Sequence, residues 1–228
     1  MKRISPFVCS LFLLLATPGL AESDEKPSTI EITARATVTS TPNVLTLSFA
    51  VDTDGPLAKD AVDENAERTQ NVLAALRKVG GKEIKIWTSG FSLSPLYEKG
   101  DPSRPSGFRA RNSVILESKM LDKAGVFIDE AAAAGVSRVS NLVFSSDKEE
   151  DLRRQAAVEA FKQATRDAEM LAKAAGLAIK RVVKISHDQR EHVPPGVLRE
   201  AAFAGVQTPI AIGEITVHAN VHVVFELE

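Results

Sequence analysis

Four histidines are the side chains of this sequence best suited to bind a metal ion or to transfer protons. His218 and His222 lie in an alternating apolar stretch near the C-terminus, which predicts that both point to one face of a strand. Four strand residues separate them by about 13 Å, whereas the ligands of one zinc ion lie about 2 Å from the metal. The pair alone cannot share a metal, so we interpret both as solvent-facing residues or as an intersubunit contact.

The other two histidines, His187 and His192, bound the polar segment HDQREH (187–192). Its mixed nitrogen and oxygen donors could hold a transition metal. The spacing matches no established metal motif, however, and turns after strands are routinely this polar. We therefore predict no metal site and no cofactor, and we keep both histidines as candidates for a ligand or interface contact.

Motifs for covalent and phosphate chemistry are missing from the sequence. It has no G-x-S-x-G nucleophile elbow, no H-E-x-x-H zinc pattern and no glycine-rich phosphate loop. Its single cysteine, Cys9, lies in the N-terminal segment. We expect the protein not to be an enzyme; an uncharacterised hydrolase, which would need a perturbed acid or base in a cleft, is the least favoured alternative.

Aromatic residues gather in and just before the stretch TSGFSLSPLYEKG (88–100). Trp87 is the only tryptophan of the chain and Tyr97 the only tyrosine, with Phe91 between them. Aromatic side chains beside glycine and proline can form a ligand platform, but more often they are core or rim residues of paired strands. We interpret the three as packing or subunit contacts, with a small-ligand site as the alternative.

The N-terminal residues MKRISPFVCSLFLLLATPGLA have the pattern of a cleavable signal peptide, with cleavage expected after Ala21. Loss of Lys2 and Arg3 lowers the basic count from 28 to 26 against 30 acidic residues, a net charge of −4. A slightly acidic chain without basic blocks argues against nucleic-acid binding. We expect a periplasmic protein whose mature chain, 22–228, has no transmembrane segment.

Hydrophobic periodicity predicts the elements of the first half of the chain. Alternation over 30–38 and 45–51 indicates two strands, which we expect to form a hairpin through the turn at 41–43. Apolar residues at helical spacing follow Pro56 and stop at Gly80. A strand over 84–96, with a bulge at Gly90, is then expected to pair with a strand over 108–117.

The second half predicts a short helix over 122–134, a strand over 136–145, a long helix, and strands over 179–186 and 215–227. The long helix is expected to begin at a capping box formed by Ser146 and Glu149 and to run to Ala175. One face of this helix is lined by small or apolar residues, namely Leu152, Ala156, Ala160, Ala164, Ala168, Leu171 and Ala175. A long irregular segment before the last strand suggests a binding or mobile loop.

These elements predict an α+β protein with two small subdomains of mainly antiparallel sheet packed with helices, one of them long and Ala-rich. We place the approximate subdomains at 29–106 plus 208–228 and at 107–187, with an irregular loop over 188–207.

Five segments in order resemble the SIMPL-domain family, also called DUF541, across essentially the whole mature chain. They are ITARATVTSTPNVLTLSFAV (32–51), IWTSGFSLSPLYE (86–98), GFRARNSVILE (107–117), the stretch 133–176 and TPIAIGEITVHANVHVVFELE (208–228). Asn43 stands where the family usually has Asp, and the two residue types serve similarly in turns.

The resemblance implies an α+β fold with two small subdomains in an exported protein, periplasmic or associated peripherally with the outer membrane. Some members are linked to oxidative-stress tolerance or recognised as surface antigens, and no established catalytic residues can be carried over. Because a strand-rich chain exposes strand edges that need covering, we expect a homo-oligomeric scaffold or binding module. The alternative is a periplasmic protein that binds a small ligand or metal through the 187–211 loop or the Trp87–Tyr97 region.

Overall fold

The computed structural model describes residues 27–98, 101–187 and 208–228, and it confirms the α+β fold. The elements in chain order are β1 (Thr29–Ser40), β2 (Val44–Gly55), α1 (Ala58–Gly80), β3 (Ile84–Glu98), β4 (Asp101–Ser118), the 3₁₀ turn η1 (Leu121–Lys123), α2 (Ala124–Ala133), β5 (Arg138–Ser145), α3 (Glu149–Ala174), β6 (Ile179–His187) and β7 (Ile215–Leu227).

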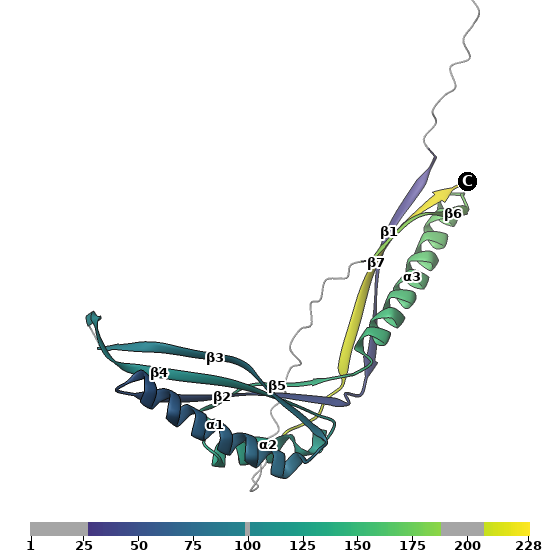
Figure 1. The fold of residues 1–228 in the computed structure, drawn as a ribbon. Coiled ribbons are helices and arrows are strands. Elements are labelled where there is room, and N and C mark those ends of the chain that lie inside the picture. The colour runs from purple at the N-terminus through teal and green to yellow at the C-terminus, as the bar shows by residue number, and fades with distance from the viewer. Residues whose placement is uncertain (1–26, 99–100, 188–207) are drawn as a thin grey trace, which may run out of the picture.

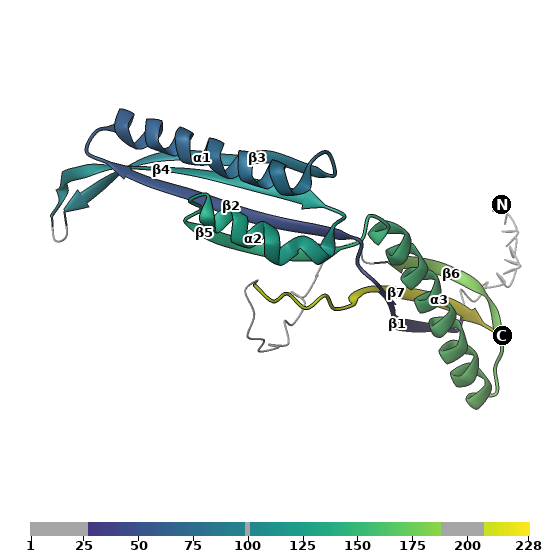
Figure 2. The same cartoon turned by 90° about the horizontal axis from the view of Figure 1, so that it is seen from below.

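A four-stranded antiparallel sheet forms the larger half, with strand order β3-β4-β2-β5. Helices α1 and α2 lie side by side on one of its faces (Figure 2). The apolar side chains of β2 alternate toward these helices and are removed from water there, which is the main source of stability for this half. The core contains Leu45, Leu47, Phe49, Val51, Val72, Leu76, Leu116, Phe127 and Ala131.

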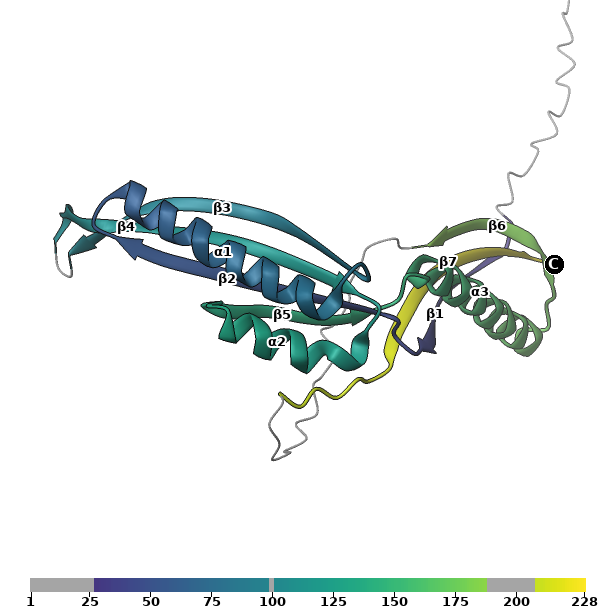
Figure 3. The same ribbon diagram turned by 60° about the horizontal axis from the view of Figure 1, so that its bottom comes forward.

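A three-stranded antiparallel sheet with order β1-β7-β6 forms the other half, and α3 packs on one face of it (Figure 3). Small side chains let this helix lie close to the sheet, and its buried stripe consists of Ala156, Ala160, Ala164, Ala168 and Ala172. The predicted stripe is confirmed from Ala156 to Ala168, whereas Leu152 before it is only half-buried. Leu171 and Ala175 are exposed, because the burial continues at strict four-residue spacing to Ala172.

The two halves meet at a bend, which gives the molecule its elongated, angled shape (Figure 1). Among the described residues, three segments cross the bend: residues 41–43 between β1 and β2, residues 146–148 between β5 and α3, and residues 208–214, which lead into β7. Before reaching β7, this last segment docks on α2. There Asp129 accepts hydrogen bonds from the backbone N–H of Thr208 at 3.1 Å and from its hydroxyl at 2.6 Å.

The predicted hairpin of the first two strands is wrong. β1 pairs along its whole length with β7, from Thr29 opposite Glu226 to Ser40 opposite Ile215, whereas β2 pairs with β4 and β5. The link at 41–43 contains Pro42 and carries the chain across the bend instead of reversing it. Strand alternation indicates which side chains share a face, but it does not indicate the partner strand.

Strand pairing also groups the chain differently from the predicted subdomain boundaries. β3 and β4 are neighbours in one sheet, although the predicted boundary at 106/107 falls inside β4. β1, β6 and β7 form the other sheet although they belong to different predicted subdomains. The expected signal peptide, 1–21, and the expected loop, 188–207, lie outside the described residues.

Predictions of single elements agree better with the structure. The helix before Gly80 is confirmed as α1, and the paired strands 84–96 and 108–117 are confirmed as β3 and β4, with a register shift between Thr88 and Gly90. The capping box is wrong, because α3 begins only at Glu149 and has no side-chain cap. The Ser146 hydroxyl instead accepts a hydrogen bond from the backbone N–H of Lys148 at 3.1 Å, which shapes the turn before the helix.

Candidate functional site

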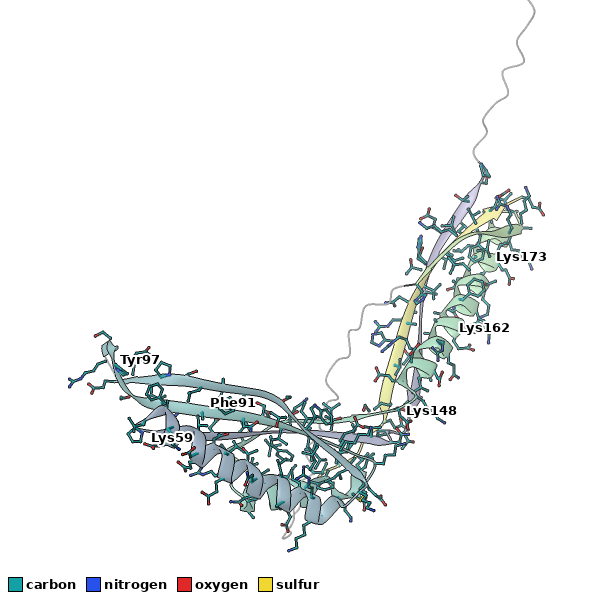
Figure 4. The ribbon with its side chains drawn as sticks, in the orientation of Figure 1. Lys59, Phe91, Tyr97, Lys148, Lys162 and Lys173 are labelled. Carbon is teal, nitrogen blue, oxygen red and sulfur yellow. The ribbon has the colours of Figure 1, made fainter. Side chains whose placement is uncertain are left out.

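β3 is an outer strand whose second edge is unpaired among the described strands. No charged residue occurs between Ile86 and Tyr97. Four large side chains of this stretch are well exposed: Trp87 at 42%, Phe91 at 54%, Leu93 at 40% and Tyr97 at 52%. Phe91 lies near the middle of the strand and Tyr97 near its outer end (Figure 4). We call the stretch from Ile86 to Tyr97 the β3 edge.

The register with β4 shows which way the side chains of the β3 edge point. Leu93 lies opposite Ala110 and Phe91 opposite Asn112, so both occupy the face that α1 covers elsewhere. Trp87 lies opposite Ile115 on the other face, because the bulge between Thr88 and Gly90 changes the phase of the strand. α1 lies mainly over β2 and β4, which leaves Phe91 and Leu93 exposed.

The other outer strands carry features that discourage edge-to-edge pairing. β6 contains Lys180, Arg181 and Lys184 and has two register shifts against β7. β1 contains Glu31 and Arg35, and β5 is short, with eight residues that begin at Arg138. Charges, bulges and shortness are the usual protections of exposed edges. The β3 edge has a bulge and Pro95, but it lacks charge over its whole length.

The face of the four-stranded sheet opposite the helices carries ion pairs between β2 and β4. The guanidinium of Arg109 donates two hydrogen bonds to Asp54 at 2.7 and 2.6 Å, and that of Arg111 donates two to Asp52 at 2.6 and 3.2 Å. These hydrogen bonds lower the pKa of both carboxyl groups. An open hollow of about 490 Å³ lies beside them. Carboxylates held ionised in this way are poor general acids at neutral pH.

The three histidines that the structure describes lie apart from the β3 edge. His222 accepts or donates a hydrogen bond at Nδ1 with the Thr33 hydroxyl at 3.1 Å, and its Nε2 lies 3.7 Å from Glu31. It borders an open hollow of about 430 Å³. His218 lies opposite Thr37, and His187 lies opposite Val221 at the end of β6. Nowhere in residues 27–98, 101–187 and 208–228 do three or more His, Cys, Asp or Glu residues gather in a metal-binding arrangement. His192 lies outside the described residues.

Glu226 is a buried carboxylate that sequence reasoning missed. Its side chain is 7% exposed, and its oxygens lie 2.8 Å from Lys180 Nζ and 2.5 Å from an Arg181 guanidinium nitrogen. The hydrogen bond from Lys180 lowers the pKa of Glu226. Both cations come from the neighbouring strand β6, so the arrangement fixes β6 to β7. The sequence signal for this carboxylate was the pair of adjacent basic residues, Lys180 and Arg181, in a predicted strand.

Two sheets that each carry their own helical layer, joined at a bend, define a two-part α+β protein. The chain belongs to the SIMPL family, described as "Protein of unknown function (DUF541)", which matches residues 30–225. The resemblance drawn from the five sequence segments is therefore confirmed. No helix in the described ranges is both long and apolar enough to cross a membrane.

Similar proteins match over nearly their whole length. The chain is 28% identical over 247 residues to the "26 kDa periplasmic immunogenic protein" of Brucella melitensis, which covers 99% of both chains. It is 28% identical to the "Uncharacterized protein YggE" of Edwardsiella ictaluri, over 94% of this chain and 92% of that protein. The protein of the same name from Escherichia coli K12 is 26% identical, over 97% and 93%.

Proposed function

We propose that this protein is a non-enzymatic periplasmic protein that works as a homo-oligomeric scaffold or binding module. The observation that carries the proposal is the β3 edge, with its exposed aromatic side chains and no charge from Ile86 to Tyr97. A long apolar strand edge tends to pair with another strand. Self-association in a closed symmetric assembly covers such an edge without leaving a new one exposed.

The electrostatics of the described residues support a structural role. The carboxyl groups with lowered pKa are Asp52, Asp54, Asp147, Glu159 and Glu226, and each has a Lys or Arg hydrogen bond as the main cause. Catalytic acids and bases more often have a pKa moved toward neutrality by burial or by like charges. Four of these five ion pairs instead join strands or turns, and the pair of Glu159 with Lys162 lies along α3.

Location in the periplasm is part of the proposal. It is supported by the signal-peptide pattern of residues 1–21 and by the Brucella relative, whose name calls it periplasmic. A contribution to envelope or oxidative-stress tolerance and a peripheral association with the outer membrane rest on the family resemblance alone. Both are tested by a deletion strain challenged with peroxide and by fractionation of the envelope.

Light scattering coupled to size exclusion, on the purified chain across a dilution series, tests self-association. We expect a discrete species larger than the monomer that persists over a broad concentration range. A monomer at every accessible concentration would contradict the scaffold proposal and leave the β3 edge to a different partner.

A second candidate function is binding of a small ligand or metal ion on the open face of the three-stranded sheet. The hollow beside His222 supports it, because Thr33, Ser186, Asn220 and His222 bring hydroxyl, amide and imidazole groups together there. A ligand that binds the folded state raises the melting temperature. A panel of metal ions and metabolites is expected to give a shift that His222→Ala abolishes, and the absence of any shift would exclude this candidate.

A further inference from the structure

We propose that two copies of this chain join through their β3 edges, paired antiparallel about a two-fold axis at Ser92. This inference rests on the self-association proposed above and specifies its interface. The strand that pairs with the β3 edge is therefore the β3 edge of a second copy of the same chain. The two four-stranded sheets would become one continuous eight-stranded sheet, with the helices of both copies on the same side.

The charges at the ends of the strand favour an antiparallel arrangement. Lys85 lies at one end of β3 and Glu98 at the other, with no charge from Ile86 to Tyr97. In an antiparallel pair each end of one strand meets the opposite end of the other. Lys85, which pairs with Glu117 in its own chain, then approaches the partner's Glu98, whose own ion pair with Arg104 is longer, 3.7 Å against 2.7 Å. A parallel pair would place like charges beside each other, which is destabilising.

Pro95 indicates which backbone groups of β3 face the free edge. A proline within a sheet is accommodated on an edge strand with its missing N–H on the solvent side. The nitrogen of Pro95 therefore faces away from β4. Because backbone groups alternate along a strand, Phe91 and Leu93 also direct their N–H and C=O groups outward, and Ser92 directs its own toward β4.

The backbone N–H and C=O groups that point outward must pair with the outward groups of the partner strand, which leaves few registers. In one of these registers the backbone hydrogen bonds form and the apolar side chains also meet. With Ser92 opposite the partner's Ser92, Phe91 lies opposite the partner's Leu93 and each can exchange hydrogen bonds with it. Phe91, Leu93 and the same two side chains of the partner then meet on the helix side of the joined sheet, in the part that α1 does not cover. Gly90 lies opposite the partner's Ser94, and a Cβ added at Gly90 would meet nothing within 4 Å in the monomer.

The two neighbouring registers are worse. A shift that sets Phe91 opposite the partner's Phe91 places Leu93 against the partner's Ser89, a residue of the bulge. A shift in the other direction places Phe91 against the partner's Pro95, which has no N–H to donate. Only the register centred on Ser92 uses every outward backbone group between Phe91 and Leu93.

Single cysteines test this register directly. We would use the full chain with Cys9→Ser, so that each introduced cysteine is the sole thiol. Residues that face each other as a non-hydrogen-bonded pair have Cα atoms about 4.5 Å apart, which is within the range for a disulfide. Ser92→Cys should therefore form a disulfide-linked dimer under mild oxidation, seen on a non-reducing gel and reversed by dithiothreitol.

Ser94→Cys is the matched control on the same strand and face. Its partner position is Gly90, so the two introduced thiols of a Ser94→Cys dimer would lie about 13 Å apart and remain unlinked. Mixing the Ser94→Cys chain with a Gly90→Cys chain should restore a disulfide between the two. Cross-linking of Ser94→Cys with itself in place of Ser92→Cys would overturn the register.

Light scattering on the same samples separates failure of this interface from failure of the proposed function. A discrete oligomer with no cross-link at Ser92 would overturn the β3 pairing while self-association stands. A monomer at all concentrations would overturn both. An oligomer together with the Ser92 cross-link and an unlinked Ser94→Cys chain is the outcome the geometry predicts.

Discussion

Asn43 and Asp147 form a reciprocal pair of hydrogen bonds across the bend between the two halves. Asn43 Nδ2 donates to Asp147 Oδ1 at 2.7 Å, and the backbone N–H of Asp147 donates to Asn43 Oδ1 at 3.0 Å. Lys119 Nζ donates to the other carboxylate oxygen at 2.8 Å. Two of the connections that the structure describes between the halves, at Asn43 and at Asp147, are thus tied together, which fixes where each chain segment leaves its sheet.

Asn43→Asp is expected to weaken this tie, although the two residue types serve similarly in turns and the family usually has Asp here, because in this chain the amide also donates a hydrogen bond to Asp147. The Nδ2 donor disappears, and two carboxylates face each other where a hydrogen bond had formed. We expect the melting temperature at pH 7 to fall by about 2–4 °C, the shift that corresponds to roughly 1 kcal/mol in a protein of this size. Thr41→Ser, in the same connection, is the control, and an equal fall for both variants would argue against a specific role of the amide.

Asn65→Ala is expected to destabilise the larger half. The buried Asn65 Nδ2 donates to the carbonyl of Val51 at 2.8 Å and to that of Ala110 at 3.2 Å, so it ties α1 to both central strands. Its loss removes both hydrogen bonds between α1 and the sheet, and at about 0.5–1.5 kcal/mol each this costs about 1–3 kcal/mol in the free energy of unfolding by urea. The exposed Asn71 on the same helix is the control, because Asn71→Ala should change that free energy by less than about 0.5 kcal/mol. Equal effects would contradict the assigned role.

Elements and faces could be predicted from the sequence because they depend on local periodicity. Gly90 indicated the bulge, whereas the role of Trp87, Phe91 and Tyr97 as packing or subunit contacts stays a prediction. The partner of β1 could not be predicted, since alternation is the same whichever strand lies alongside. The burial of Glu226 was also hidden, because it depends on two cations that β6 brings beside it only in the folded sheet.

The ion pair of Asp52 predicts a specific dependence of stability on pH. The hydrogen bond from Arg111 lowers the pKa of Asp52 below its ordinary value of 3.8. A carboxyl with a lowered pKa in the folded state stabilises the protein above its unfolded pKa, and this contribution is lost as the pH falls through the folded value. Wild type should therefore exceed Arg111→Gln in melting temperature at pH 7, and the difference should shrink below about pH 4.

A melting-temperature difference that stays constant from pH 7 to pH 2 would show that Arg111 acts through packing and not through the charge of Asp52. Arg138 lies 3.6 Å from Asp52, a longer contact than that of Arg111. Replacement of Arg138 should therefore change the melting temperature less than Arg111→Gln does over the same pH range.

Gly125→Ala should displace the segment that leads into β7. A Cβ at this position of α2 would lie 2.2 Å from the backbone oxygen of Thr208. Because that oxygen belongs to the backbone, no rotation of a side chain can relieve the clash. We expect a lower melting temperature and faster limited proteolysis after Thr208. Gly213→Ala, where a Cβ would meet nothing within 4 Å, should leave both unchanged. Unaltered proteolysis of the Gly125 variant would contradict the docking of this segment on α2.

A charge placed in the β3 edge tests the central claim, that this edge drives self-association. Phe91→Lys and Val158→Lys are matched, because the two side chains are 54% and 53% exposed on β3 and α3 respectively. In light scattering across a dilution series, Phe91→Lys should be reduced to a monomer while Val158→Lys remains oligomeric like wild type, with both variants folded by circular dichroism. An oligomer of unchanged mass with Phe91→Lys would contradict the claim.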